Sequence, residues 1–261
     1  MHEGINLFHR GTNLYYDSMQ RSFMQYQILK APMAILDVQM SPGEKIAAES
    51  GAMVYMKGDF EIKTRTREGG FFKKIKVTAL GGESFFVNDY IAHGDCSIGL
   101  TGPPLGDIIH IEVKPGSGFI VQSGSYVAST LGVLLDTQWQ GFTKGLFGSE
   151  FFMLKAAGEG DLFLNAYGGI IQKQVTSGEK IIIDNYHLVA LSDQAEYRVT
   201  KVGGMKTTIL GGEALVTEIT GPGSLYFQTK NLRELIDLLG INQRSETTSG
   251  SGVSFGGFKI G

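Results

Sequence analysis

The sequence predicts an all-β protein made of three tandem copies of a short double-stranded β-helix or jelly-roll-like unit, with a short C-terminal helix. The first observation behind this prediction is an internal repeat. Residues 168–178 share one pattern of apolar, polar and glycine positions with residues 106–116, and residues 33–43 are a weaker third copy. The second is composition: 37 of the 261 residues are glycine, about twice the usual share of about 7%. Such a glycine content without a collagen period indicates many tight turns between short strands.

Each copy is expected to fold as strand, turn, strand, turn, strand, because short apolar runs alternate with Gly, Pro, Ser and Asn. Gly43, Gly116 and Gly178 occupy the same turn position in the three copies. The simplest explanation is a positive φ angle, which glycine adopts without steric cost. A strand is then expected at 60–66, 133–139 and 196–202, followed by a glycine-rich corner and a further apolar strand.

A helix is predicted after the third copy. Asn231 is a suitable N-cap, Glu234 completes a capping pattern, apolar residues follow at helical spacing, and Gly240 ends it. The expected divisions are a leader or tail at 1–23, repeats at 24–105, 106–167 and 168–240, and a flexible Gly/Ser-rich tail at 241–261.

Charge and cysteine content narrow the function classes. The net charge of −3 gives no global reason to expect nucleic acid as a partner. Cys96, the single cysteine, cannot form an intramolecular disulfide, which fits a reducing compartment and a buried structural thiol. The sequence has no run of about 18 apolar residues and no signal-peptide pattern. We therefore expect a cytoplasmic protein.

Glu83, Glu150 and Glu213 follow the glycine corner in the three copies. Carboxylates at equivalent positions could converge near an axis and bind a cation. The favoured interpretation is structural, because a glutamate next to two small residues can accept hydrogen bonds from the backbone of its own turn.

A basic and aromatic stretch at 57–76 is the candidate binding surface. Its residues are Lys63, Arg65, Arg67, Phe71, Phe72, Lys73 and Lys74. Cations around an exposed aromatic pair would suit an anionic lipid surface or a nucleic-acid strand. The alternative, which we favour, is a strand edge where Lys and Arg prevent aggregation and the phenylalanines are buried.

No catalytic, cofactor-binding or metal-binding residues are predicted. The histidines form neither a His-x-His pair nor a helical His-x-x-x-His pattern, which disfavours a cupin-like metalloenzyme. His110 alternates with Ile109 and Ile111, so it is expected to point to solvent. Neither a Gly-x-Ser-x-Gly elbow nor a dinucleotide-binding Gly-x-Gly-x-x-Gly motif is present.

Several motifs resemble one known family. They are Pro-Gly-Glu (42–44), Glu-Ser-Gly-Ala-Met-Val-Tyr-Met (49–56), Gly-Gly-Glu-Ser-Phe-Phe (81–86), Ala-Tyr-Gly-Gly-Ile-Ile (166–171) and Gly-Gly-Glu-Ala-Leu-Val (211–216). Together they resemble an uncharacterised bacterial and archaeal family related to the fungal "altered inheritance of mitochondria" protein, over roughly residues 24–240. The resemblance implies three repeats similar to the tryptophan-responsive RNA-binding attenuation protein, whose fold group tends to form rings. It implies no established enzymatic activity and no cofactor.

The sequence therefore predicts a non-enzymatic binding or scaffold protein that forms a homo-oligomer, with a protein or a membrane surface as a possible partner. Oligomerisation is expected from the resemblance and from edge strands that an incomplete ring of repeats would leave uncovered. A scaffold role is the analogy with the eukaryotic relative, which is linked to organisation of the mitochondrial inner membrane. The alternatives are a peripheral membrane organiser that uses the 57–76 stretch, an RNA-binding ring, and a cupin-like metalloenzyme.

Overall fold

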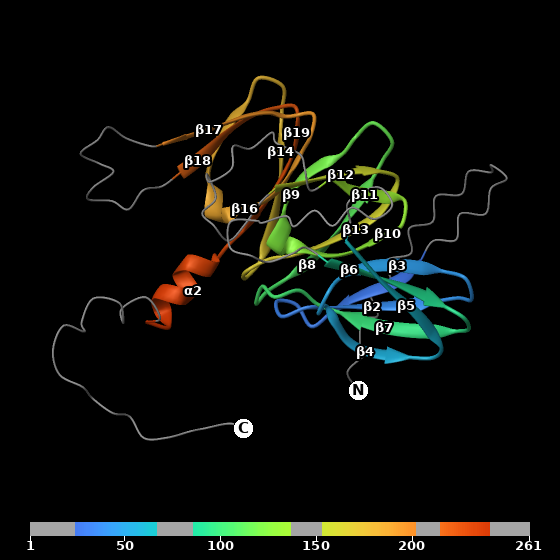
Figure 1. The fold of residues 1–261 in the computed structure, drawn as a ribbon. Helices are drawn as coiled ribbons and strands as arrows, with labels where there is room; N and C mark the ends of the chain where they lie inside the picture. The colour runs from blue at the N-terminus through green and yellow to red at the C-terminus, as the bar shows by residue number, and fades with distance from the viewer. Residues whose placement is uncertain (1–23, 67–85, 137–152, 202–214, 241–261) are drawn as a thin grey trace, which may run out of the picture.

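The computed structural model describes residues 24–66, 86–136, 153–201 and 215–240, and the predicted all-β fold is confirmed (Figure 1). The predicted leader at 1–23 and tail at 241–261 lie outside these ranges. The described strands fall into three successive sets, preceded by β1.

The bounds of the elements follow the chain. The first described strand is β1 (Gln25–Leu29). The first set is β2 (Ile35–Met40), β3 (Lys45–Glu49), β4 (Met53–Lys57), β5 (Phe60–Thr66), β6 (Phe86–Ala92) and β7 (Cys96–Leu100). The second set is β8 (Ile108–Val113), β9 (Phe119–Gln122), the 3₁₀ turn η1 (Ser123–Ser125), β10 (Tyr126–Thr130), β11 (Val133–Asp136), β12 (Met153–Gly158) and β13 (Gly160–Asn165). The third set is β14 (Ile170–Val175), β15 (Lys180–Asp184), η2 (Asn185–His187), β16 (Leu188–Ser192), β17 (Glu196–Lys201), β18 (Leu215–Thr220) and β19 (Gly223–Gln228), followed by the helix α2 (Leu232–Leu238).

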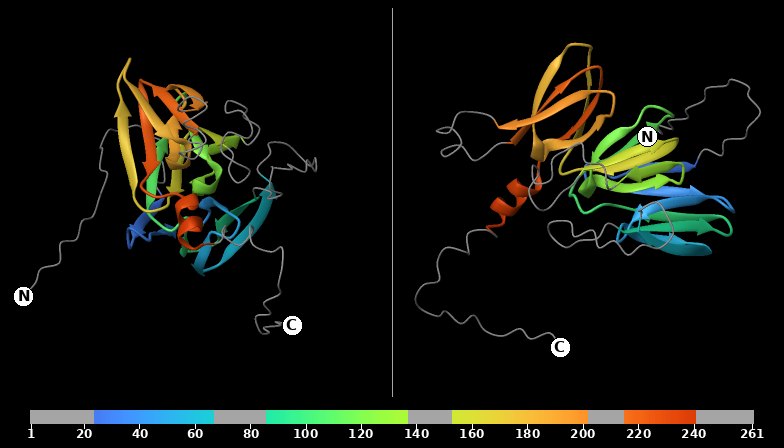
Figure 2. Two further views of the ribbon diagram at one scale, coloured as in Figure 1. Left: turned by 90° about the vertical axis from the view of Figure 1, so that its left-hand side faces the viewer. Right: turned by 45° about the horizontal axis from the view of Figure 1, so that its top comes forward.

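The three sets have the same pairing order. Each contributes two groups of three neighbouring strands: β2-β7-β4 and β5-β6-β3 in the first set, β8-β13-β10 and β11-β12-β9 in the second, and β14-β19-β16 and β17-β18-β15 in the third. The sets join because β3 pairs with β10 and β9 pairs with β16, giving two six-stranded sheets. Figure 2 shows the resulting row of three sets from two further sides.

The repeated turn glycines adopt the predicted conformation. Gly43, Gly116 and Gly178 have φ angles of 87°, 76° and 77°. In each turn the residue after the glycine donates its backbone N–H to the carbonyl three residues earlier, as in the 3.0 Å bond from Glu44 to Ser41. This geometry is that of a tight turn with a left-handed third residue, which explains the glycine in each copy.

The hydrophobic core continues across the boundaries between sets. The cluster around Leu36 and Ile98 includes Phe163 of the second set, and the cluster around Leu154 and Leu164 includes Ala47 of the first. Burial of each large apolar side chain contributes about 1.5–3 kcal/mol. The sets therefore stabilise one another in addition to their backbone pairing.

The starts of the three sets are also tied together. The backbone N–H of Ala34 donates to the carbonyl of Gly106 at 3.0 Å, and that of Asp107 donates to the carbonyl of Gly168 at 2.8 Å. Gly106 and Gly168 form a parallel bridge at this point. One glycine before β8 thus connects all three sets.

The predicted helix is present as α2, and Asn231 is its N-cap. The side chain of Asn231 accepts the backbone N–H of Glu234 at 3.0 Å, and Gly240 has a φ angle of 66°. The amide of Asn231 also lies 2.9 Å from Nε2 of His187, whose Nδ1 contacts the Gln228 carbonyl at 2.7 Å. The cap therefore anchors α2 to the third set.

The prediction that His110 points to solvent is wrong. Its Nε2 lies 2.7 Å from the carboxylate of Asp161, and its ring packs against Tyr26 and Phe163 with centroid distances of 5.0 and 5.2 Å. Burial first, and then the charge of Asp161, raise the pKa of Tyr26. These contacts come from β13, the neighbour of β8 in its sheet, and from β1 in another sheet. Local alternation does not reveal such distant side chains.

Candidate interaction surface

The joint between the first and second sets defines how one set binds the next. β3 and β10 run antiparallel, with Ala48 opposite Ala128, Ala47 opposite Ser129 and Ile46 opposite Thr130. The fully buried Tyr126 at the start of β10 donates its hydroxyl to the Ala47 carbonyl at 3.1 Å. The joint thus combines strand pairing with a buried side-chain contact.

The joint between the second and third sets repeats this arrangement. β9 and β16 are antiparallel, with Val121 opposite Ala190, Ile120 opposite Leu191 and Phe119 opposite Ser192. Ile46 and Phe119 each stand three residues after the turn glycine, so the two joints have the same register.

Two hydrogen bonds between Asp193 and Gly118 reinforce the second joint. Asp193 donates its backbone N–H to the Gly118 carbonyl at 2.9 Å, and its carboxylate accepts the Gly118 N–H at 3.0 Å. The same carboxylate lies 3.1 Å from Nζ of Lys155. A side chain of the third set is therefore held by two residues of the second.

β4 is the first-set counterpart of β10 and β16, and it lies open. The three strands share one irregularity, because the register of each shifts after its first residue: Met53 in β4, Tyr126 in β10 and Leu188 in β16. Within the described ranges β4 pairs only with β7. Met53, Val54, Tyr55 and Met56 are 40%, 55%, 37% and 38% exposed, whereas Leu188, Val189, Ala190 and Leu191 are 0% exposed.

β15 is the third-set counterpart of β3 and β9, and it is open as well. Its partner in the described part of the chain is β18 alone. Ile182 is 63% exposed, whereas its counterparts Ala47 and Ile120 are 0% and 2% exposed. Three consecutive isoleucines, 181–183, therefore lie on a strand at the edge of its sheet.

The side chain of Tyr55 packs against β7, the strand with which β4 pairs. It lies over Gly99 of β7, where any added Cβ would collide with the tyrosine ring. Burial first, and then a hydrogen bond to Asp37, raise the pKa of Tyr55. Tyr55 therefore contacts β7 of its own sheet and remains 37% exposed.

Glu218 on β18 holds two cations beside the β15 edge. Its carboxylate lies 3.1 Å from Nζ of Lys180 and 3.3 Å from Arg198. The hydrogen bond and charge of Lys180, followed by those of Arg198, lower the pKa of Glu218. The side chain of Lys180, the first residue of β15, therefore extends towards the neighbouring strand β18.

This arrangement predicts a pH dependence. Because the pKa of Glu218 is lower in the folded than in the unfolded chain, its contribution to stability is present above the unfolded pKa and is lost as pH falls through the folded pKa. NMR titration of the Glu218 carboxyl should give a midpoint below that of a free glutamate. Lys180→Gln should raise this midpoint, and an unchanged midpoint would contradict the assignment.

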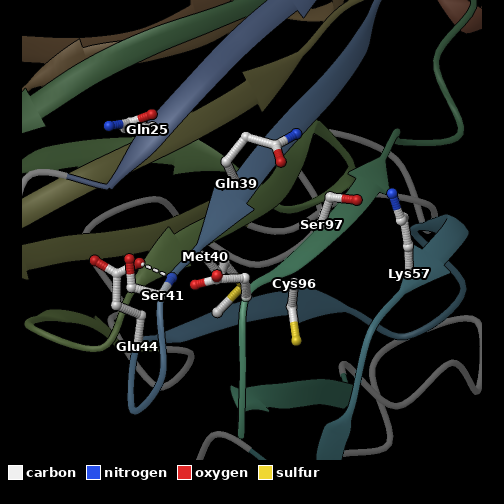
Figure 3. A pocket seen from close by; sticks show the side chains of 9 residues that line it. Gln25, Gln39, Met40, Ser41, Glu44, Lys57, Cys96 and Ser97 are labelled. Atoms are coloured by element: carbon white, nitrogen blue, oxygen red, sulfur yellow. Dashed lines mark hydrogen bonds between the residues drawn. The ribbon is translucent and has the colours of Figure 1, made fainter.

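A hollow of about 480 Å³ is lined by residues of β1, β2, β7 and the last residue of β4 (Figure 3). Its lining is mostly polar: Gln25, Gln39, Met40, Ser41, Glu44, Lys57, Asp95, Cys96 and Ser97. The Glu44 carboxylate accepts the Ser41 backbone N–H at 2.7 Å, and the buried Cys96 thiol donates to the Asp59 carbonyl at 3.2 Å. The thiol is buried as predicted, and these two groups serve local structure.

The structure describes only part of the predicted basic and aromatic surface. Lys63 and Arg65 lie on β5, the outermost strand of its sheet. Lys63 is exposed and pairs with Glu61 at 2.9 Å, which fits protection of a strand edge. The other members, Arg67, Phe71, Phe72, Lys73 and Lys74, lie outside the described residues, so membrane contact through this stretch stays an alternative hypothesis.

The equivalent carboxylates Glu83, Glu150 and Glu213 also lie outside the described residues. In the described ranges, no three His, Cys, Asp or Glu side chains gather closely enough to hold a metal ion. None of the helices in those ranges is long and apolar enough to cross a bilayer.

Sequence reasoning anticipated open edges but did not identify the two strands. The sequence does not distinguish them, because the buried counterpart runs 126–128 and 188–191 lack charged residues just as 53–56 and 181–183 do. Natural edge strands commonly carry a charge or a proline to prevent further pairing.

The fold is that of an all-β protein whose described strands form several antiparallel sheets. Residues 26–230 match the model of the family described as mitochondrial biogenesis AIM24, and the chain belongs to this family. It is 26% identical over 212 residues to an uncharacterised protein of Streptococcus pyogenes serotype M6, covering 78% of this chain and 85% of that protein. The X-ray crystal structure of a Streptococcus pyogenes protein is similar in fold, with a TM-score of 0.67 and 24% identity, over 84% of this chain and 99% of that one.

Proposed function

We propose that this protein is a non-enzymatic scaffold that associates with copies of itself through its open strand edges. The observation that supports this proposal is β4, whose four apolar residues are exposed where both counterpart strands are buried in joints. An unpaired apolar strand offers backbone hydrogen-bonding groups and apolar side chains to a further strand.

We further infer that the three strand sets are tandem repeats of a short double-stranded β-helix unit like that of the attenuation protein, with boundaries at 24–105, 106–167 and 168–240. The support for this inference is the same pairing order in all three sets. A shared unit also accounts for the shared turn glycines.

Native mass spectrometry of the full chain tests the scaffold proposal. The unmodified protein should form an oligomer. Met56→Lys should shift the mass of the assembly towards that of the monomer, because a charge on β4 opposes burial of the edge. Leu134→Lys is the matched control, because Leu134 is 66% exposed on β11, a strand that neither joint uses. This variant should form the same oligomer as the unmodified protein. A monomeric unmodified protein at micromolar concentration, or equal effects of both variants, would refute the proposal.

A further inference from the structure

The two joints inside the chain follow one rule. In each, the strand after the turn glycine (β3 or β9) pairs with the strand after the next set's second turn (β10 or β16). Each joint therefore uses two different edges, one from each set. An interface of this kind can be repeated along a row.

The first and last sets each keep one member of this pair of edges. The first set retains β4, the counterpart of β10 and β16, and the third retains β15, the counterpart of β3 and β9. Figure 1 places β4 at one end of the molecule and β17 and β18, the sheet of β15, at the other. The two edges of one chain are thus far apart, but they are complementary between chains.

We propose that β15 of one copy pairs with β4 of the next copy, antiparallel and head to tail, in the register of the two internal joints. This inference rests on the proposed self-association and names its partner and geometry. Ile183 then stands opposite Tyr55, Ile182 opposite Met56 and Ile181 opposite Lys57, because these residues are the counterparts of the pairs in the internal joints.

The chemistry of the two edges fits this pairing. Ile182 and Met56 are the counterparts of Ile120 and Leu191, an apolar pair buried to 2% and 0% exposure in the second joint. Charges are absent from 181–183 and from 53–56, so no like charges oppose each other along the central part of the contact. Pairing would bury the exposed side chains and satisfy backbone groups of both edges.

Because the two edges differ, the contact leaves one free copy of each edge at the ends of every open oligomer. Such an interface produces a closed ring if the rotation between copies closes, and an open row if it does not. In both cases each added copy contributes three strand sets.

Disulfide cross-linking between two variants tests the register. Both variants carry Cys96→Ser, which removes the native thiol; one adds Met56→Cys and the other Ile182→Cys. Opposite residues of antiparallel strands have Cβ atoms about 4.5–5.5 Å apart, close to the range in which disulfides form. We expect a cross-linked dimer when the two variants are mixed and oxidised. No cross-linked dimer should form when either variant is oxidised alone.

Lys180→Cys in place of Ile182→Cys is the register control. Lys180 is two residues away on the same strand face, so its distance to position 56 rises to about 7–8 Å, and the cross-link should be lost.

Native mass spectrometry of the same samples before oxidation separates the two proposals. An oligomer that gives no Met56–Ile182 cross-link, or an equal yield with the Lys180→Cys control, overturns the register while self-association stands. Monomers without a cross-link overturn both.

Discussion

Tyr126→Ala is expected to lower the free energy of unfolding by about 3–5 kcal/mol, because it removes a fully buried aromatic ring and leaves a cavity. Tyr126 is 0% exposed, and its hydroxyl bonds to Ala47 of the neighbouring set at 3.1 Å. The substitution therefore weakens the core of the second set and the first joint together. Equilibrium urea unfolding, followed by circular dichroism, measures the change.

Tyr126→Phe shows which part of the Tyr126 side chain matters, and Leu134→Ala is the control. Tyr126→Phe keeps the ring and removes the hydroxyl, and should cost about 1 kcal/mol. Leu134→Ala, at an exposed position, should change the stability by less than about 0.5 kcal/mol. Equal losses for Tyr126→Ala and Leu134→Ala would show that the joint does not depend on Tyr126.

Gly106→Ala is expected to destabilise the protein by about 3 kcal/mol, at the upper end of the range for overpacking. A Cβ at this position would collide with the backbone oxygens of Ala166 and Gly168. Backbone atoms cannot rotate away as a flexible side chain can, so the contact between the starts of the sets would have to open. Amide hydrogen exchange should then quicken at Asp107, whose N–H bonds to Gly168.

Gly94→Ala is the matched control for this substitution. An added Cβ at Gly94 would meet no atom within 4 Å, so the stability should change by less than about 0.5 kcal/mol. If Gly106→Ala were equally mild, the close approach of the two bridging glycines would not be a constraint on the fold.

Features governed by neighbouring residues were predictable from the sequence. The strand expected at 60–66 coincides with β5, and α2 begins directly after the predicted cap Asn231. Gly43, Gly116 and Gly178 have the positive φ angles that their repeated position indicated. In these cases one residue type carries the conformational preference, so alternation, capping and turn chemistry are sufficient.

Features governed by distant partners were not predictable. His110 was expected to face solvent, but Asp161 and Phe163 lie more than 50 residues further along the chain and cover it. Likewise, Val54 and Val189 occupy the same place in their strands, yet only Val189 has a neighbouring set beside it. Position in the row, rather than local sequence, decides which apolar strand is buried.

The two internal joints differ from any contact between chains in their response to dilution. The strands of each internal joint belong to one polypeptide, so their effective concentration is set by the connecting chain and does not fall when the protein is diluted. A contact between chains obeys mass action instead. Lowering the protein concentration should therefore separate an assembly into whole chains, each with its three strand sets still joined. It should never release a single set or a pair of sets.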